Sequence, residues 1–219
     1  MANYIPAVIK RVKRRSIALI IDRQGQLIVR APLKCPDREI FAFIKQKSDW
    51  IEKKQQEIKQ NAIKPLDLTD NSTFIYFGKK YIVRTKPNGR VAIKDDYIYI
   101  PNTNVKVSVT RFLKNNLKKV CTDLANKYSQ MFKFEYKSIS ITSAKTCWGS
   151  CSGQNRLNFT YRLALCPIPV VEYIVIHELC HTKVKNHSTN FWKLVKSIYP
   201  EYKTIERWLK TNRQIIDMI

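Results

Sequence analysis

The chain has 219 residues, of which 44% are hydrophobic and 11% aromatic, so it can bury a core and is neither disordered nor of low complexity. It carries 40 lysines and arginines against 17 acidic residues, and this net charge of +23 favours contact with polyanions such as nucleic acid. No apolar run approaches the roughly 20 residues that cross a bilayer, and the first residues lack an apolar segment with a cleavage site, so we expect no membrane association and a cytoplasmic location.

Residues 1–104 predict a β-rich N-terminal region that contains one helix. Two β-branched runs within residues 15–32 predict a hairpin. A helix is expected to begin at Pro36-Asp37, with Asp37 as N-cap and an apolar stripe that extends to Ile58. Four short strands separated by turns between Phe74 and Pro101 then predict a β-meander.

Residues 105–219 predict a second region that is mainly helical, so the whole chain is expected to be of the α+β class. Apolar residues recur at intervals of three and four through a long amphipathic helix. A strand over 138–142, a loop over 144–154 and two short strand-like pieces within 156–165 follow. Three further helices are expected over about 170–184, over 188–199 and after Pro200. The long helix is expected over about 105–133.

A metal site is predicted at His177-Glu178-Leu179-Cys180-His181, an HExxH sequence. Two histidines four residues apart on a helix direct both imidazoles at one point, where they can bind Zn2+ at about 2.0–2.1 Å. Glu178 lies beside them, where its carboxylate can hold a water molecule and accept its proton. Apolar neighbours indicate a buried helix, in which these polar groups need a compensating partner such as a cation. His187, beyond the expected helix end, completes three ligands for one zinc per chain and leaves one position open.

Several segments together are similar to a known family. In the C-terminal half they are Cys147–Ser152 (CWGSCS), Leu157-Asn158, Tyr173, His177–His181, Asn186-His187-Ser188 and Phe191-Trp192, and in the N-terminal half Ser16–Pro32, Ser48–Ile51 and Phe77-Gly78 with Tyr81. They resemble the YgjP-like metallopeptidases, which are related to the SprT-like and WLM zinc peptidases. The resemblance covers nearly the whole chain and implies a zincin-like catalytic domain over 105–219. It also implies that His177, His181 and His187 are the zinc ligands and Glu178 the general base.

The chain departs from related patterns at two positions. Val184 stands where metzincins have a glycine that lets the chain turn between ligands, so we expect Asn186 to supply the turn in a left-handed conformation. Cys147 stands where the family usually has an arginine. An acid from a later helix, Glu201 or Glu206, is the alternative third ligand.

The WGSC segment has two interpretations. Backbone N–H groups of this loop can approach the metal and stabilise an oxyanion, or the loop can be a tight turn in which Trp148 fills the core. Tyr173, one turn before His177, either reaches the active site or packs between helices. The residues expected to bind substrate or stabilise the oxyanion are Gly149, Ser150, Asn158, Tyr161, Arg162 and Tyr173.

These features predict a zinc-dependent metallopeptidase that acts on peptides or proteins through a metal-activated water and a glutamate general base. One alternative keeps the site and hydrolyses phosphoanhydrides or nucleotides, which the positive charge favours. The other is a basic, nucleic-acid-associated protein with a non-catalytic zinc site, which the basic run Lys10–Arg15 favours.

Overall fold

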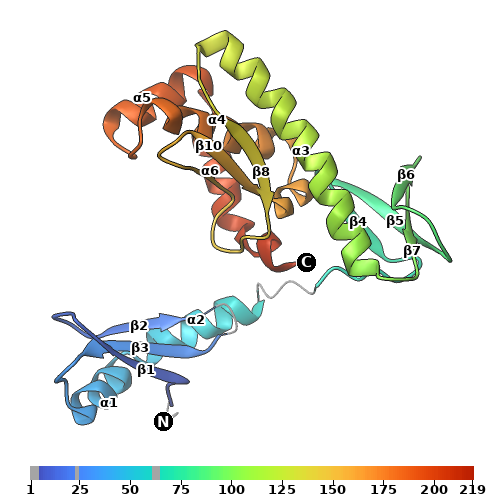
Figure 1. The fold of residues 1–219 in the computed structure, drawn as a ribbon. Helices are drawn as coiled ribbons and strands as arrows, with labels where there is room; N and C mark the ends of the chain where they lie inside the picture. Colours follow the sequence, from blue (N-terminus) through green and yellow to red (C-terminus); the bar gives the residue numbers. More distant parts are fainter. Residues whose placement is uncertain (1–4, 23–24, 61–64) are drawn as a thin grey trace. The chain divides into compact units, whose positions relative to one another are not determined.

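The computed structural model describes residues 5–22, 25–60 and 65–219. The chain forms two compact units, Met1–Ala62 and Ile63–Ile219 (Figure 1). The described residues contain six α-helices and three small sheets, which agrees with the expected α+β class. Among them, every helix is too short or too polar to cross a membrane.

The first unit is a three-stranded sheet with two helices. The sheet order is β1-β3-β2, with β1 parallel and β2 antiparallel to β3. Alternate residues of β3 are fully buried, and they pack with apolar residues of both helices. The elements are β1 (Val8–Val12), β2 (Ala18–Ile21), β3 (Leu27–Pro32), α1 (Asp37–Gln46) and α2 (Ser48–Gln60).

The sequence expectation for this unit was right about the hairpin and wrong about the helix. Strands β2 and β3 form the expected hairpin, although Arg23 and Gln24 of its turn lie outside the described residues. The single expected helix is two, because the backbone departs from helical geometry at Lys47. Asp37 is the first residue of α1 rather than its N-cap, a position that Pro36 occupies. Strand β1 was not anticipated, because four of its five residues are exposed and it lacks the alternation that identifies a strand.

The second unit begins with a four-stranded sheet in the order β4-β5-β7-β6, which corrects the expected meander. Strands β5 and β7 pair in parallel, and β6 lies at the edge. Burial explains this order, because Val83, Ile98 and Ile100 on the central strands are fully buried whereas β6 exposes two of its three residues. The strands are β4 (Thr73–Tyr76), β5 (Lys79–Lys86), β6 (Ala92–Lys94) and β7 (Tyr97–Pro101).

The remaining elements follow the expected order closely. The long helix α3 agrees with its predicted range to within a residue, and Ser188 is the N-cap of α5 as expected. The second strand-like piece is instead the 3₁₀ helix η1. The elements are α3 (Val105–Phe132), β8 (Ser138–Thr142), β9 (Gly149–Cys151), β10 (Arg156–Thr160), η1 (Tyr161–Leu165), α4 (Ile168–Lys183), α5 (Thr189–Ile198), α6 (Tyr202–Thr211) and η2 (Arg213–Asp217).

One hydrophobic core joins the four-stranded sheet to the C-terminal helices. Phe74 and Val83 belong to the same buried cluster as Leu113 of α3 and Val175 of α4. The four-stranded sheet accordingly belongs to the same compact unit as the C-terminal helices, and the boundary between the units in the sequence falls between residues 62 and 63. The predicted boundary at 104/105 differs from this one, because it groups the four-stranded sheet with the N-terminal region.

A third sheet, with the order β8-β10-β9, places β9 at its edge. Strand β8 is parallel and β9 antiparallel to the central β10. Helix α4 packs against β9, α3, α5, α6 and η1, so it lies at the centre of this unit (Figure 1). Residues on α4 are therefore held by neighbours on nearly every side.

Candidate active site

Helix α4 is apolar over most of its circumference, and the fold buries two of the polar side chains it carries. Glu178 is 5% exposed and His181 8% exposed. The helical repeat puts His177 and His181 one turn apart on the same side of α4, with ring centroids 4.9 Å apart. The spacing read from the sequence thus brings these two imidazoles together.

The chain turns back after α4 and brings His187 to the same point. Val184 ends the helix in an extended conformation, with φ −127° and ψ 102°. Asn186 does not adopt the left-handed conformation expected of it. Its Oδ1 instead accepts a hydrogen bond of 3.3 Å from the backbone N–H of Ser188, which closes the turn before α5.

Three imidazole nitrogens converge. The Nε2 of His187 lies 3.0 Å from the Nε2 of His177 and 3.2 Å from that of His181. His181 Nδ1 lies 3.0 Å from the carbonyl oxygen of Val184, which accepts its N–H and leaves Nε2 with a free lone pair. Because each neutral imidazole has a single N–H, mutual hydrogen bonds cannot satisfy all three facing nitrogens. A single cation at their meeting point would do so, and three imidazoles are a donor set that suits zinc.

Aromatic rings of α5 support the histidines. The ring of Phe191, which is fully buried, lies 4.9 Å from His177, 4.3 Å from His181 and 4.8 Å from His187 between centroids. Trp192 lies beside His177 and His187. These contacts restrict the rotation of all three imidazoles.

Burial also sets the protonation of the site. Desolvation lowers the pKa of His177 to about 3, with smaller contributions from His181 and His187. Burial likewise lowers the pKa of His181. The same cause raises the pKa of the Glu178 carboxyl to about 8. Neutral imidazoles are the form that binds a metal, and a basic carboxyl suits proton transfer.

The carboxylate of Glu178 lies against Gly149 on β9. A Cβ atom at position 149 would lie 2.8 Å from Oε1 and 2.9 Å from Cγ of Glu178, closer than side chains tolerate. No hydrogen bond or ion pair of Glu178 occurs within the described residues. A buried carboxyl without a partner beside three converging imidazoles fits a site that holds a cation and a water molecule.

Strand β9 presents further expected site residues at the edge of its sheet. Ser150 is exposed and pairs in register with Asn158 on β10. The Nδ2 of Asn158 donates to the Oγ of Ser150 at 3.4 Å. The free side of β9 offers backbone groups to an extended chain.

Tyr161 and Arg162 lie on η1 and are both buried. The guanidinium of Arg162 donates to the carbonyl oxygens of Ser143 at 2.9 Å and Ile219 at 2.8 Å and lies over the Tyr161 ring. These two hydrogen bonds of Arg162 hold the segment after β8 and the residue at position 219 in place.

Tyr173 links His177 to α6. Its hydroxyl lies 3.4 Å from His177 Nδ1 and 3.3 Å from Glu206 Oε1, to which it donates. Glu206 therefore contacts the site through Tyr173, and neither it nor Glu201 belongs to the cluster of potential metal ligands in the described residues. Sequence reasoning missed the Val184 carbonyl and the orienting position of Glu206, because both contacts depend on how the chain turns after α4.

Comparison with known proteins identifies a family. The model of the YgjP-like, metallopeptidase domain family matches residues 15–212. Two crystal structures resemble part of the chain: the metallopeptidase zymogen of Pyrococcus abyssi abylysin and that of Methanocaldococcus jannaschii jannalysin. The first is 23% identical over 42% of this chain and 95% of its own, with a TM-score of 0.39. The second is 24% identical over 41% and 92%, with a TM-score of 0.37. No curated protein matches the chain.

Proposed function

The chain belongs to the YgjP-like metallopeptidase family, and we propose that it hydrolyses peptide bonds at one zinc ion held by His177, His181 and His187. The observation that carries this proposal is the convergence of the three Nε2 atoms, with His187 within 3.2 Å of both other histidines. A zincin-like arrangement with an HExxH helix is thus the finer description we infer for residues 105–219.

Zinc bound there would supply Lewis acidity, which activates water near neutral pH and polarises the scissile carbonyl. Glu178 is the general base: it accepts the proton of the attacking water and returns it to the leaving amine. Its position beside the ligands and its raised pKa support this role. Gly149 supports it as well, because the missing side chain leaves room for the carboxylate.

Strand β9 is proposed to align the substrate. An extended peptide can pair with the free edge of β9 and bring its scissile carbonyl to the histidines. Ser150 and Asn158 lie on or beside that edge and can donate to the substrate, and the N–H of Gly149 can contribute to oxyanion stabilisation. Tyr173 orients His177, whereas the donors of Arg162 support the fold.

The test compares wild type with Glu178→Gln and His187→Ala. We expect about one zinc per wild-type chain by mass spectrometry, with cleavage of unfolded casein. Glu178→Gln should keep the zinc and lose at least about 100-fold in rate, because a general base contributes 10²–10⁴-fold. His187→Ala should lose both.

Glu201→Gln is the matched control, since it makes the same chemical change at an exposed residue and should change neither zinc content nor rate. Full activity in Glu178→Gln would refute the general-base role. Zinc loss in Glu201→Gln would refute the three-histidine ligand set. Phosphate release from nucleotides without casein cleavage would favour the phosphohydrolase alternative.

A further inference from the structure

The outer face of α3 carries a row of hydrogen-bond donors. Their positions, at intervals of three or four residues except for the adjacent Lys118 and Lys119, put them on one side of the helix, roughly opposite the buried Leu113 and Leu117. The row extends about 21 Å along the helix at 1.5 Å per residue. This α3 donor row consists of Ser108, Arg111, Asn115, Lys118, Lys119 and Thr122.

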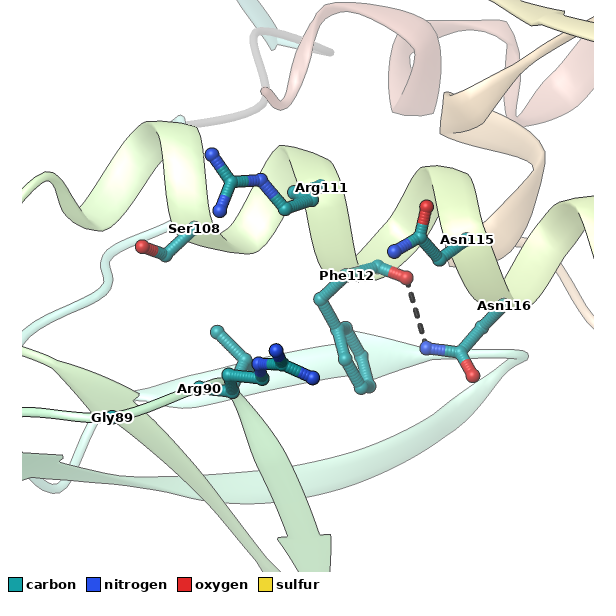
Figure 2. Close-up of a pocket in the computed structure, with 8 residues that line it drawn as sticks. Gly89, Arg90, Ser108, Arg111, Phe112, Asn115 and Asn116 are labelled. Carbon is teal, nitrogen blue, oxygen red and sulfur yellow. Dashed lines mark hydrogen bonds between the residues drawn. The ribbon is translucent and has the colours of Figure 1, made fainter.

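Two hollows follow the α3 donor row. The first, of about 330 Å³, lies between α3 and the segment before β6, and Arg90 and Arg111 line it from opposite elements (Figure 2). The second, of about 610 Å³, continues along α3 past Asn115, which lines both. Asp123, at its far end, is the single acidic residue among the side chains that line the two hollows.

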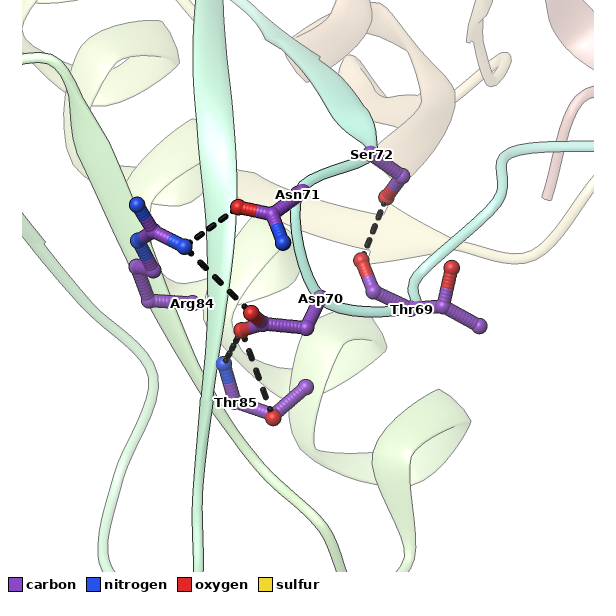
Figure 3. A network of polar contacts seen from close by, with 6 residues as sticks. All are labelled: Thr69, Asp70, Asn71, Ser72, Arg84 and Thr85. Atoms are coloured by element: carbon purple, nitrogen blue, oxygen red, sulfur yellow. Dashed lines mark hydrogen bonds and ion pairs between the residues drawn. The ribbon is translucent and has the colours of Figure 1, made fainter.

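These cations lack acidic partners, in contrast to others in the same unit. Arg84 on β5 contacts Asp70 and Asn71 in a polar network that also includes Thr85 (Figure 3). Lysines elsewhere pair with Asp96 and Glu172. Within the described part of the chain, none of the cationic residues of the α3 donor row forms an ion pair, and neither does Arg90. Their charge is therefore available to an external anion.

We propose that the α3 donor row and Arg90 bind the phosphodiester backbone of nucleic acid. Arginine and lysine together with neutral serine, asparagine and threonine donors are the groups that contact phosphates in nucleic-acid complexes. A track of about 21 Å is as long as roughly six base-pair steps, at 3.4 Å per step along a duplex axis. A row of donors of this length matches the unbroken charge of nucleic acid better than scattered carboxylates of an acidic protein.

This binding face is separate from the proposed peptidase site, because it shares no residue with the histidine cluster. The inference therefore does not rest on the peptidase activity. Contacts to phosphate would make binding insensitive to base sequence and strongly dependent on salt.

The experiment measures fluorescence anisotropy of a labelled 20-nucleotide DNA, single-stranded and as a duplex, with the full chain between 50 and 200 mM salt. Wild type should bind one or both forms more tightly than about 100 μM at 50 mM salt. Arg90→Ala/Arg111→Ala removes two phosphate contacts, so the slope of log K against log salt should become less negative by about 1.8 for the duplex. Lys118→Ala/Lys119→Ala should have a similar effect, and both pairs are exposed, so the variants should fold.

The matched control is Lys203→Ala/Lys210→Ala, which removes the same charge from exposed residues of α6 and should leave the slope nearly unchanged. The proposal is overturned if neither DNA form binds, or if the control weakens binding as much as the α3 variants. It is also overturned if an oligoglutamate of equal charge displaces the DNA as well as unlabelled DNA does, since the partner would then be an acidic polypeptide.

Discussion

Gly149→Ala tests the contact between β9 and the proposed general base. The new methyl group would lie 2.9 Å from Cγ of Glu178, whereas ordinary contacts begin at 3.4 Å. The carboxylate must therefore move by about half an ångström or β9 must shift away. The backbone itself can accept alanine, because φ of Gly149 does not lie in the left-handed region.

The size of the effect follows from the demands of proton transfer. A misplacement of about 1 Å can cost 100-fold in rate, so half that distance should lower kcat/KM by roughly tenfold. Overpacking of a buried site costs about 1–3 kcal/mol of stability. Zinc content should not change, because the methyl group meets Glu178 rather than a histidine.

The assay combines kcat/KM on a cleaved peptide, zinc content and the urea midpoint of unfolding. Gly153→Ala, in the turn that follows β9, is the control, since a Cβ there meets nothing within 4 Å and should leave all three values unchanged. If Gly149→Ala matches Gly153→Ala in kcat/KM, the close contact does not position the base and the reasoning is wrong.

Three further predictions concern groups around the site and the adjoining sheet. Tyr173→Phe should weaken zinc binding by up to about tenfold in chelator competition, because His177 loses an orienting contact; unchanged affinity would contradict this. Phe191→Ala should destabilise the fold by about 3–5 kcal/mol in urea and release zinc; full zinc retention would count against the ring's supporting role. Asp70 has a lowered pKa, chiefly through the Thr85 N–H, so its stabilising contribution should disappear as pH falls below about 4. When urea unfolding is measured between pH 2 and 6, the midpoint of Asp70→Asn should lack this pH-dependent contribution. Identical pH profiles of the midpoint for wild type and variant would refute the assignment.

Local periodicity predicted the helices after residue 104 well. The range of α3 follows from apolar residues three and four apart, and the approach of His177 to His181 follows from the helical repeat alone. Both are properties of a single segment. They require no knowledge of what the segment packs against.

Strand pairing and helix breaks were harder to predict from the sequence. Strands β5 and β7 are separated in sequence by β6, yet they pair because their buried residues form the centre of the sheet. The helix breaks at Lys47, but Ile44 before the break and Ile51 after it are both buried in the same core. The apolar pattern in the sequence therefore continues across the break and does not reveal it. Alternation and stripes indicate which face is buried, but they do not identify the partner.

The proposed site depends both on spacing within one segment and on packing between distant segments. Mutations that disturb one or the other should therefore have different effects. The three proposed zinc ligands come from the spacing within α4 and the turn to His187, so their replacement should remove the metal. The position of Glu178 relative to Gly149 comes from the packing of α4 against β9, which lies far away in sequence. Changes at that contact should therefore impair proton transfer while the zinc remains bound. Phe191 touches all three histidines from a third element, so its loss should affect stability and metal together.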